Sequence, residues 1–500
     1  YVKYITGETP MFLENQEMLY RREGSDTMRN IKVRSSTMND LIYGSATKIA
    51  SEIRQKNVSC LEVIEMHLNR IEVVNPALNA VVQLCSERAL AEAKAADVKI
   101  SKKENIGPLH GVPMTLKDSL DTAEVVSTGG TKGRQNFIPD NDSTVTSRLR
   151  NAGAILLGKT NTPEFTLAGE TDNLVYGRTN NPYNLTRIPG GSSGGAAAII
   201  ASGGSPLDIG SDTGGSIRMP SHFCGITGIK PNSGRIPRTG HIVNHAMGAV
   251  DSLTQNGPMA RYVEDLILTL PILCGRDWID PAIIEMPLGD PYKVKIENLR
   301  VAFYTDNGIH EPSQAIQDAV RSAAMDLGDL GATVEEDRPN ALEMIPEINN
   351  ALNGGDGREW VKRLIESANT KEISPFLQKR INSAEPISTA EYTANLERLD
   401  QYRSHMLSFM KHYDVIISPT APFTATDHGE TFSNKNKNAF AYTSAYNMTG
   451  WPGTVVRYGT CEENLPIGVQ IVSRPWREDV SLAIALELEK ISGGWKNPNI

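Results

Sequence analysis

Apolar positions recur at helical spacing near the start of the chain. Over 46–53 they fall three and four residues apart, which predicts an amphipathic helix with one buried face. A second helix is expected from Ser59, because Glu62 three residues later completes a capping box that satisfies two free backbone N–H groups. Pro76 is expected to lie beyond the end of this helix.

Strands and helices alternate along the rest of the chain. Short apolar runs predict strands over 78–84, 299–304, 414–418, 454–456 and 468–472. Helical spacing predicts helices over 87–98, 313–330, most of 340–412 and 480–491, with a connecting loop over 281–298. This alternation favours an α/β layer architecture.

Two compositional boundaries divide the sequence. Residues 1–38 are polar and mixed in charge, and we expect an N-terminal arm there, followed by one domain over 39–500. Between 107 and 257, glycine and serine accumulate and helices follow glycine turns directly. Glycine adds no side chain to a core and costs backbone entropy. This stretch is therefore a candidate for close approach of the backbone to a ligand.

Charge and cysteine content narrow the class of protein. The 500 residues include 50 Lys and Arg against 59 Asp and Glu, and the net charge of −9 argues against a nucleic-acid-binding protein. The five cysteines are scattered without metal-ligand spacing, so we expect reduced thiols and no metal site. No apolar run approaches the ~20 residues of a membrane span, and the first 27 residues lack a secretory signal. We expect a cytoplasmic protein without a membrane span.

Two segments of the glycine-rich stretch suggest a base and a ligand loop. Lys117 ends an apolar, strand-like run over 111–117. A lysine in that place is usually a solvated charge, but burial can lower its pKa until the amine acts as a base. Over 189–195 a glycine turn leads into a helix, so backbone N–H groups point out of the helix start. A flexible linker or a phosphate loop is the alternative, although the glycine spacing fits no phosphate motif.

A third segment, over 208–220, places Ser216 directly after two glycines. Several backbone N–H groups can converge near such a hydroxyl, which is what an oxyanion hole requires. A hydroxyl is a poor nucleophile without a base in reach. The segment therefore suggests a serine nucleophile but leaves the identity of its base open.

A Ser/His/Asp esterase is one way to supply that base. Ser193 fits the nucleophile position of GxSxG, and Asp414 or Asp427 with His428 could complete a triad. The nucleophile elbow needs a strand before it, however, and 181–189 has the composition of turns. This disfavours the histidine triad.

The sequence resembles the amidase signature enzymes. GGSSGG at 190–195 and DTGGSIRMPSHFCGITGIKP at 212–231 follow the family signature almost letter for letter. Outside this centre, the segments 418–422, 447–452 and 465–476 are also similar to the family. The resemblance implies a single large α/β domain whose central twisted, mixed β-sheet is covered by helices on both faces.

The resemblance also implies the catalytic machinery. Ser216 would be the nucleophile and Lys117 the base, and Ser192, joined to Gly191 by a cis peptide bond, would pass a proton between them. No metal and no organic cofactor would be needed. The oxyanion hole would consist of the N–H groups of Thr213, Gly214, Gly215 and Ser216. The supporting residues would be Ser193, Asp212 and Arg218.

The residues before Asn447 bear on the substrate. In the A subunit of the tRNA-dependent amidotransferase, an aspartate seven residues before this motif binds the glutamine amine. Phe440 stands at that position here, which disfavours the glutamine-hydrolysing alternative. Phe440, Tyr446 and Trp451 instead suggest an apolar or aromatic substrate pocket. We therefore expect hydrolysis of apolar or aryl amides, with esters, anilides and carbamates, as in a urethanase, as further substrates of the same chemistry.

A non-catalytic binding protein on the same scaffold is the other class of function. It is disfavoured, because all three triad positions are intact. We expect the protein to bind a small amide-type substrate and no nucleic acid. A homodimer is one possible assembly.

Overall fold

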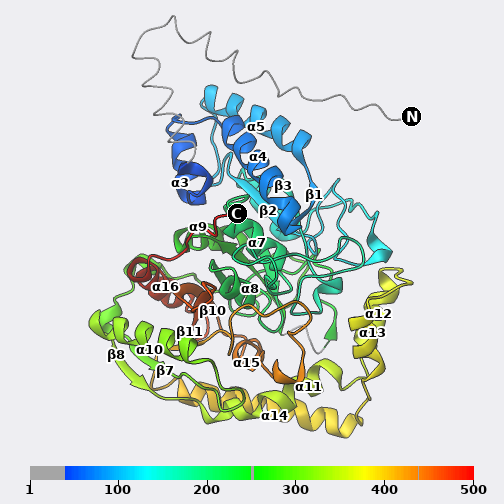
Figure 1. The fold of residues 1–500 in the computed structure, drawn as a ribbon, viewed down its shortest axis with the longest axis vertical. Coiled ribbons are helices and arrows are strands. Elements are labelled where there is room, and N and C mark those ends of the chain that lie inside the picture. Colours follow the sequence, from blue (N-terminus) through cyan, green and yellow to red (C-terminus); the bar gives the residue numbers. More distant parts are fainter. Residues whose placement is uncertain (1–39, 249–252, 437) are drawn as a thin grey trace, which may run out of the picture.

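The computed structural model describes residues 40–248, 253–436 and 438–500 and contains two β-sheets (Figure 1). The strands are β1 (Val81–Leu84), β2 (Pro113–Lys117), β3 (Ile155–Thr160), β4 (Leu207–Asp212), β5 (Thr227–Lys230), β6 (Gln255–Ala260), β7 (Arg300–Phe303), β8 (Thr333–Glu336), β9 (Val415–Pro419), β10 (Gly453–Thr460) and β11 (Pro466–Ser473). The larger sheet has the order β4-β6-β5-β10-β11-β9-β7-β8, and the smaller has the order β1-β3-β2.

Both sheets are mixed. β7 runs parallel to β8 and β9, and β2 runs parallel to β3, whereas β10 and β11 are antiparallel. The edges of the two sheets meet where Thr115 Oγ1 of β2 donates to Asp208 Oδ2 of β4 at 2.7 Å. This contact sets the ends of the two strands, Lys117 and Asp212, on either side of one polar region.

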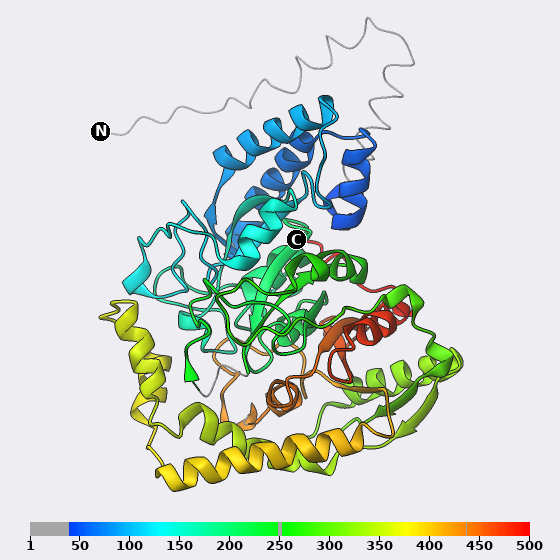
Figure 2. The same cartoon turned by 180° about the vertical axis from the view of Figure 1, so that it is seen from behind.

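The helices surround these sheets, as Figure 2 shows from the opposite side. They are α3 (Ala46–Arg54), α4 (Cys60–Leu78), α5 (Ser86–Ser101), α6 (Thr144–Asn151), α7 (Gly194–Ala201), α8 (Arg218–Phe223), α9 (Val263–Leu273), α10 (Gln314–Asp329), α11 (Ile345–Gly354), α12 (Glu359–Ser367), α13 (Pro375–Asn382), α14 (Thr389–Phe409), α15 (Ala441–Met448) and α16 (Glu478–Ser492).

Neighbouring residues of β10 show that helices cover both faces of the larger sheet. Thr454 Oγ1 donates to Ser481 Oγ of α16 at 3.0 Å. A Cβ on the preceding Gly453 would instead lie 3.4 Å from Arg218 of α8. Successive residues of a strand point to opposite faces, so α16 and α8 lie on opposite sides of β10. The expected α/β architecture is confirmed.

Most elements predicted from apolar spacing are present. The capping box is formed, since Ser59 and Glu62 exchange hydrogen bonds at the start of α4. Pro76 corrects the prediction for the end of this helix, because α4 continues through Pro76 to Leu78 and β1 begins later than expected. The stretch 281–298 contains only two 3₁₀ turns, Pro291–Lys293 and Ile296–Asn298. The arm predicted for 1–38 lies outside the described residues.

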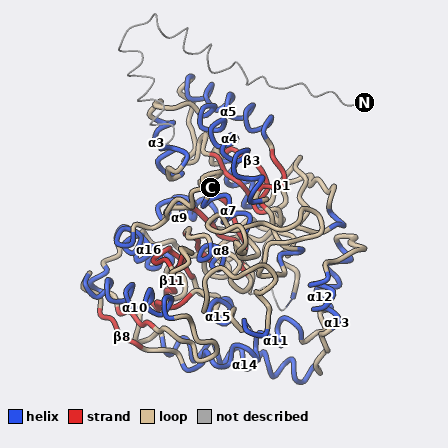
Figure 3. The backbone as a smooth tube through the Cα atoms, in the orientation of Figure 1, coloured by secondary structure: helices blue, strands red, loops and turns tan. Residues whose placement is uncertain are grey.

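The glycine-rich stretch forms the interior around α7 and α8, where much of the chain is loop (Figure 3). Every residue of α7 is buried. Gly195 permits this packing, because a Cβ there would lie 2.4 Å from the backbone nitrogen of Asn161. The C-terminal segment covers the far end of α7, where Trp495 Nε1 donates to the carbonyl of Ala201 at 3.0 Å. In the described part of the chain, no helix is both long and apolar enough to span a bilayer.

Candidate active site

Lys117 lies at the last position of β2, and its side chain is completely buried. Its Nζ lies 2.6 Å from Ser192 Oγ, 2.9 Å from Ser193 Oγ and 2.9 Å from Ser211 Oγ. Lys117 is therefore not solvated, although a lysine at a strand end usually is. Three hydroxyl groups replace the water that would otherwise surround the amine.

Burial determines the charge of Lys117. It lowers the pKa of the amine from 10.5 to about 7, although the carboxylates of Asp212 and Asp208 favour the charged form. Burial likewise raises the pKa of Asp208 to about 7 against hydrogen bonds from Thr115 and Thr160. Near neutral pH, about half of the Lys117 side chains are then neutral amines with a free electron pair.

The two serines that the sequence pairs with Lys117 come from adjacent segments. Gly191 and Ser192 are joined by a cis peptide bond. The N–H of Ser193 donates to the carbonyl of Ser216 at 3.2 Å, which holds the start of α7 beside the turn that precedes α8. Ser192 is buried next to Lys117, whereas Ser216 is half-buried and lines an open cavity. The site therefore runs from a buried amine to an accessible hydroxyl.

The turn before Ser216 offers backbone donors to this cavity. Thr213, Gly214 and Ser216 line it. The N–H of Gly215 donates to Asp212 Oδ1 at 2.8 Å, so it is engaged and does not face the cavity as a free donor. Within the described part of the chain, the N–H groups of Thr213, Gly214 and Ser216 have no acceptor. The predicted set of four donors is thus reduced by Gly215 in this structure.

Gly215 also shows why this turn needs glycine. Its φ of +130° belongs to a region that other residues rarely adopt. A Cβ at this position would lie 2.4 Å from Thr443 Oγ1. That hydroxyl in turn donates to the carbonyl of Gly214 at 2.6 Å, which fixes the turn against α15.

A buried ion pair fixes the start of α8. Arg218 Nε and Nη2 donate to the two carboxylate oxygens of Asp212 at 3.0 and 2.9 Å, and neither side chain is exposed. Burial alone would raise the pKa of Asp212, but the attraction of Arg218 and its hydrogen bonds outweigh burial and hold the pKa well below its usual range. Asp212 remains charged, so it keeps its hydrogen bond to the backbone of Gly215.

Two further residues complete this pair, and sequence reasoning assigned them no role. Asn447 Oδ1 accepts from Arg218 Nη2 at 2.6 Å while its Nδ2 donates to Asp212 Oδ1 at 2.8 Å. Gln470 Oε1 accepts from Arg218 Nη1 at 2.7 Å. Both lie in segments that resemble the family, 447–452 and 465–476, and that resemblance was the available signal.

His241 lies behind Ser211, which contacts the amine directly, and neither residue was predicted. His241 Nε2 lies 3.0 Å from Ser211 Oγ, and its Nδ1 lies 2.9 Å from the carbonyl of Val243. Burial and repulsion by Lys117 lower the pKa of His241 to about 3. The backbone N–H of Val243 also donates to His241 Nδ1 at 3.1 Å. A neutral imidazole has one donor and one acceptor nitrogen, so His241 can bond both the Val243 backbone and the Ser211 hydroxyl in either tautomer.

The histidine triad is not assembled. Ser193 Oγ contacts Lys117 rather than a histidine. Asp414 pairs with Arg300 at one end of β7, and Asp427 pairs with another arginine. His428 lies near other carboxylates and makes no hydrogen bond with these residues in the described structure. No strand leads directly into Ser193, because the segment between β3 and α7 contains only one 3₁₀ turn, as the turn-like sequence predicted.

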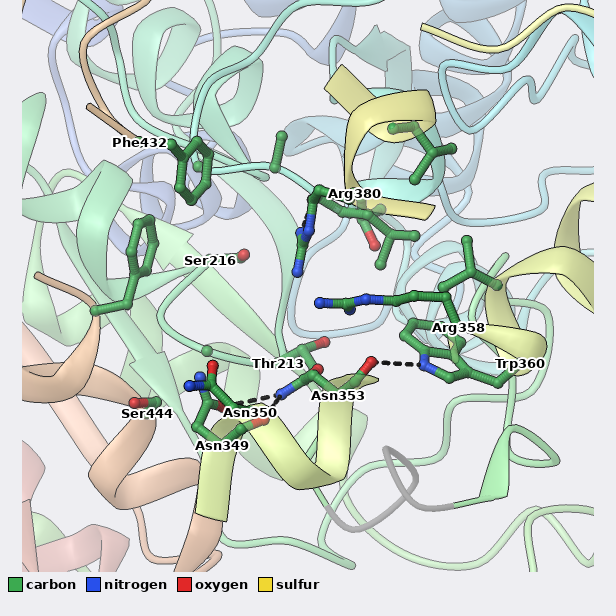
Figure 4. Close-up of a pocket in the computed structure, with 18 of the residues that line it drawn as sticks. Thr213, Ser216, Asn349, Asn350, Asn353, Arg358, Trp360, Arg380, Phe432 and Ser444 are labelled. Atoms are coloured by element: carbon green, nitrogen blue, oxygen red, sulfur yellow. Dashed lines mark hydrogen bonds between the residues drawn. The ribbon is translucent and has the colours of Figure 1, made fainter. Parts of the chain in front are cut away.

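The cavity at Ser216 has one aromatic wall and one basic wall (Figure 4). Its volume is about 190 Å³. The rings of Phe432 and Phe440 stack with centroids 5.6 Å apart. The residues that line it are Thr166, Leu167, Ala168, Gly169, Thr213, Gly214, Ser216, Asn349, Asn350, Asn353, Arg358, Trp360, Val361, Leu377, Arg380, Ile381, Phe432, Phe440 and Ser444.

Of the three aromatic residues predicted for the substrate pocket, Phe440 lines this cavity and two do not. Phe440, which directly precedes α15, and Ser444 in its first turns lie four residues apart and both border the cavity. Tyr446 lies on another face of that helix and bonds the Tyr304 hydroxyl at 2.9 Å in the core. Trp451 is buried in the same apolar cluster. Tyr446 and Trp451 thus pack the core behind the site.

Comparisons with known proteins identify relatives along most of the chain. The profile of the Amidase family matches residues 62–482. The chain is 33% identical to the A subunit of the glutamyl-tRNA(Gln) amidotransferase of Alkaliphilus metalliredigens, over 88% of this chain and 95% of the relative. It is also 33% identical to fatty-acid amide hydrolase 2 of Homo sapiens, over 92% and 91%.

A solved structure extends the similarity to the fold. A bacterial aryl acylamidase of the amidase signature family superposes with a TM-score of 0.81 at 27% identity, covering 90% of this chain and 96% of the other. The family profile spans both serines and Lys117. The chain therefore belongs to the amidase signature family and is an amidase.

Proposed function

We propose that this amidase cleaves amide C–N bonds through a seryl acyl-enzyme formed on Ser216. The observation that carries the proposal is the buried amine of Lys117, 2.6 Å from Ser192 Oγ, beside a segment whose Ser216 faces the cavity. A neutral amine in this place can act as a base without any histidine.

Acylation requires two proton transfers. Neutral Lys117 accepts the proton of the Ser192 hydroxyl while Ser192 accepts the proton of Ser216. Ser216 Oγ bonds to the carbonyl carbon, and the carbonyl oxygen becomes an oxyanion. The N–H groups of Thr213, Gly214 and Ser216, which lack acceptors in the described structure, stabilise that charge. Ser192 then donates its proton to the leaving nitrogen as the C–N bond breaks, and receives one from Lys117.

Deacylation follows the same route in reverse. A water molecule gives a proton to Ser192 and attacks the acyl carbon, and Ser216 leaves with a proton returned by Ser192. The leaving group takes no part in this step. Esters, anilides and carbamates are therefore further substrates that the same machinery can accept.

The aromatic wall favours apolar or aryl substrates. Phe432 and Phe440 present stacked rings beside Leu377 and Ile381. Aromatic groups bind well against such surfaces. Relatives named for fatty-acid amides and aryl acylamides are consistent with this substrate class.

Hydrolysis of glutamine within a tRNA-dependent amidotransferase is the second candidate. It is favoured by the 33% identity to the glutamyl-tRNA(Gln) amidotransferase chain of Alkaliphilus metalliredigens. No described residue that lines the cavity is acidic, however, so nothing there would pair with the ammonium group of glutamine. We rank this function below amide hydrolysis for that reason.

Labelling and turnover together test the proposal. A fluorophosphonate probe should label Ser216, and Ser216→Ala should abolish both labelling and hydrolysis of an aryl amide. Ser221→Ala is the matched control, because Ser221 is buried in the same segment and bonds only the carbonyl of Ile217. Full activity of Ser216→Ala would contradict the mechanism. Faster hydrolysis of glutamine than of aryl and fatty amides would contradict the substrate class.

A further inference from the structure

Two arginines extend into the cavity that contains Ser216. Arg358 directly precedes α12, and Arg380 lies in α13. Figure 4 shows both guanidinium groups directed into the open space on the side of Ser216. Both side chains are half-buried. Figures 1 and 2 place α12 and α13 together at one side of the molecule, so a single pair of helices supplies this wall.

Neither arginine is neutralised within the described structure. No carboxylate of residues 40–248, 253–436 and 438–500 forms an ion pair with either arginine or lines the cavity. Asp356 attracts Arg358 but lies outside the cavity, where it accepts from the backbone N–H of Trp360 at 3.0 Å. Arg358 Nε is buried and has no hydrogen-bond partner. The basic wall therefore holds two positive charges with unused donors.

The two charges also repel each other. Burial lowers the pKa of Arg380 to about 10, and repulsion by Arg358 contributes to the same shift. Such a pair is costly in a partly dry cavity unless an anion binds between the two groups. A planar guanidinium binds carboxylates in particular, because its N–H groups match two carboxylate oxygens at once.

We propose that Arg358 and Arg380 bind a carboxylate group of the substrate. The preferred substrate is then an amide with an apolar or aryl part against Phe432 and Phe440 and a carboxylate against the arginines. A free amino acid fits less well, because the described lining of the cavity offers no acidic partner for an ammonium group. This substrate class rests on the proposed amide hydrolysis and narrows it.

A purely structural role explains only some of the contacts of Arg380 and none of those of Arg358. Arg380 Nη1 donates to the carbonyl of Leu167 at 2.8 Å, and its guanidinium lies 5.6 Å from the ring of Phe376. These contacts leave other N–H groups of Arg380 free. Arg358 donates no side-chain hydrogen bond to any described residue. Its guanidinium therefore has no structural contact to explain its place in the cavity.

Matched pairs of substrates test the proposal. One pair is the 4-nitroanilide of glutaric acid and that of pentanoic acid, which differ by a carboxylate on the acyl side. The other is 4-acetamidobenzoate and acetanilide, which differ by a carboxylate on the leaving side. We expect the carboxylate to raise kcat/KM at least tenfold in one pair. Arg358→Gln and Arg380→Gln should each reduce that ratio several-fold, and added salt should reduce it as well.

Arg363→Gln is the control for these variants. Arg363 lies in the same helix as Val361, but its side chain is 64% exposed and faces Asp356 rather than the cavity. It should leave the ratio between paired substrates unchanged. The wild type could instead show a kcat/KM ratio of carboxylate to neutral substrate near one for both pairs. If hydrolysis of the neutral substrates still depended on Ser216, this result would overturn the carboxylate site and leave the proposed function intact.

Binding separates failure of the site from failure of the chemistry. With Ser216→Ala, calorimetry should detect 3-phenylpropanoate and a much weaker signal for 3-phenylpropanamide. If the protein binds the acid selectively and Arg358→Gln loses that binding, the carboxylate site is supported. If the wild type at the same time hydrolyses no anilide, only the proposed function is refuted. Equal binding of acid and amide would overturn the site.

Discussion

Replacing Lys117 by methionine should remove both the catalytic base and a pH-dependent cost in stability. Methionine has similar length and fits a buried apolar position, but it cannot accept a proton. The pKa of Lys117 falls from 10.5 to about 7 through burial. The folded wild type therefore binds fewer protons than the unfolded chain between these two pH values.

The size of both effects follows from that difference. At pH 7 about half of the buried amines are neutral, against roughly one in 3,000 for an ordinary lysine. The same shift is worth about 5 kcal/mol between pH 7 and 10.5. At a pH below the pKa of Lys117 in the folded protein, the buried charge lowers the free energy of unfolding by this full amount. The destabilisation decreases as the pH rises and is lost at about pH 10.5, the pKa of the unfolded chain. Loss of the three hydroxyl contacts is a separate cost that does not depend on pH.

Two assays on the same variants measure these effects. In the wild type, kcat/KM should rise with pH through about 7, and Lys117→Met should lose most activity. The free energy of unfolding of the wild type relative to Lys117→Met should rise by several kcal/mol from pH 7 to about 10. Lys159→Met is the control, since Lys159 is equally buried and its pKa is also lowered, but it bonds Thr122 and Ser127 instead of the serines of the site. The assignment of Lys117 as a base with a lowered pKa would be refuted if kcat/KM rose with pH only near pH 10. It would also be refuted if the difference in unfolding free energy between wild type and Lys117→Met did not change with pH.

Other predictions follow from the surrounding network. His241→Leu should lower kcat about tenfold, because the Ser211 hydroxyl loses the imidazole that holds it beside the amine, and His241→Gln should retain more activity in the same assay. Asp212→Asn should lower the free energy of unfolding by roughly 3–5 kcal/mol, because it leaves a buried guanidinium uncompensated, as denaturant titration would show. Gly215→Ala should reduce both activity and the unfolding midpoint, whereas Gly214→Ala should reduce the midpoint little, because a Cβ at Gly214 meets nothing within 4 Å.

The parts of the site that could be predicted from sequence are those that a short segment determines by itself. Ser216 follows two glycines, so the short segment predicts a turn with backbone donors near the hydroxyl, although Thr443 of α15 also fixes that turn. Lys117 could be placed at a strand end, because an apolar run before a turn predicts a buried strand. Its state of charge could not be predicted, because it depends on burial of the amine by segments that are distant in sequence, including those that carry Ser193 and Ser211.

The walls of the cavity show the opposite case. Phe440, Tyr446 and Trp451 lie within twelve residues, and proximity in sequence suggested one aromatic pocket. Helical rotation separates them, so that only Phe440 borders the cavity. The basic wall comes from 340–412, which the apolar pattern describes simply as helical and which gives no sign that Arg358 faces Ser216.

The net charge of the chain shows why amino-acid composition could not predict a basic cavity wall. Acidic residues outnumber basic ones by nine, which suggests no affinity for anions. An exposed carboxylate more than about 10 Å away is screened by salt, whereas a half-buried guanidinium in the cavity acts on a ligand at contact distance. Arg358 and Arg380 line a cavity without a single described acid. The local sign of charge is therefore positive in a protein that is acidic overall, and that local sign is what a substrate bound beside Ser216 would experience.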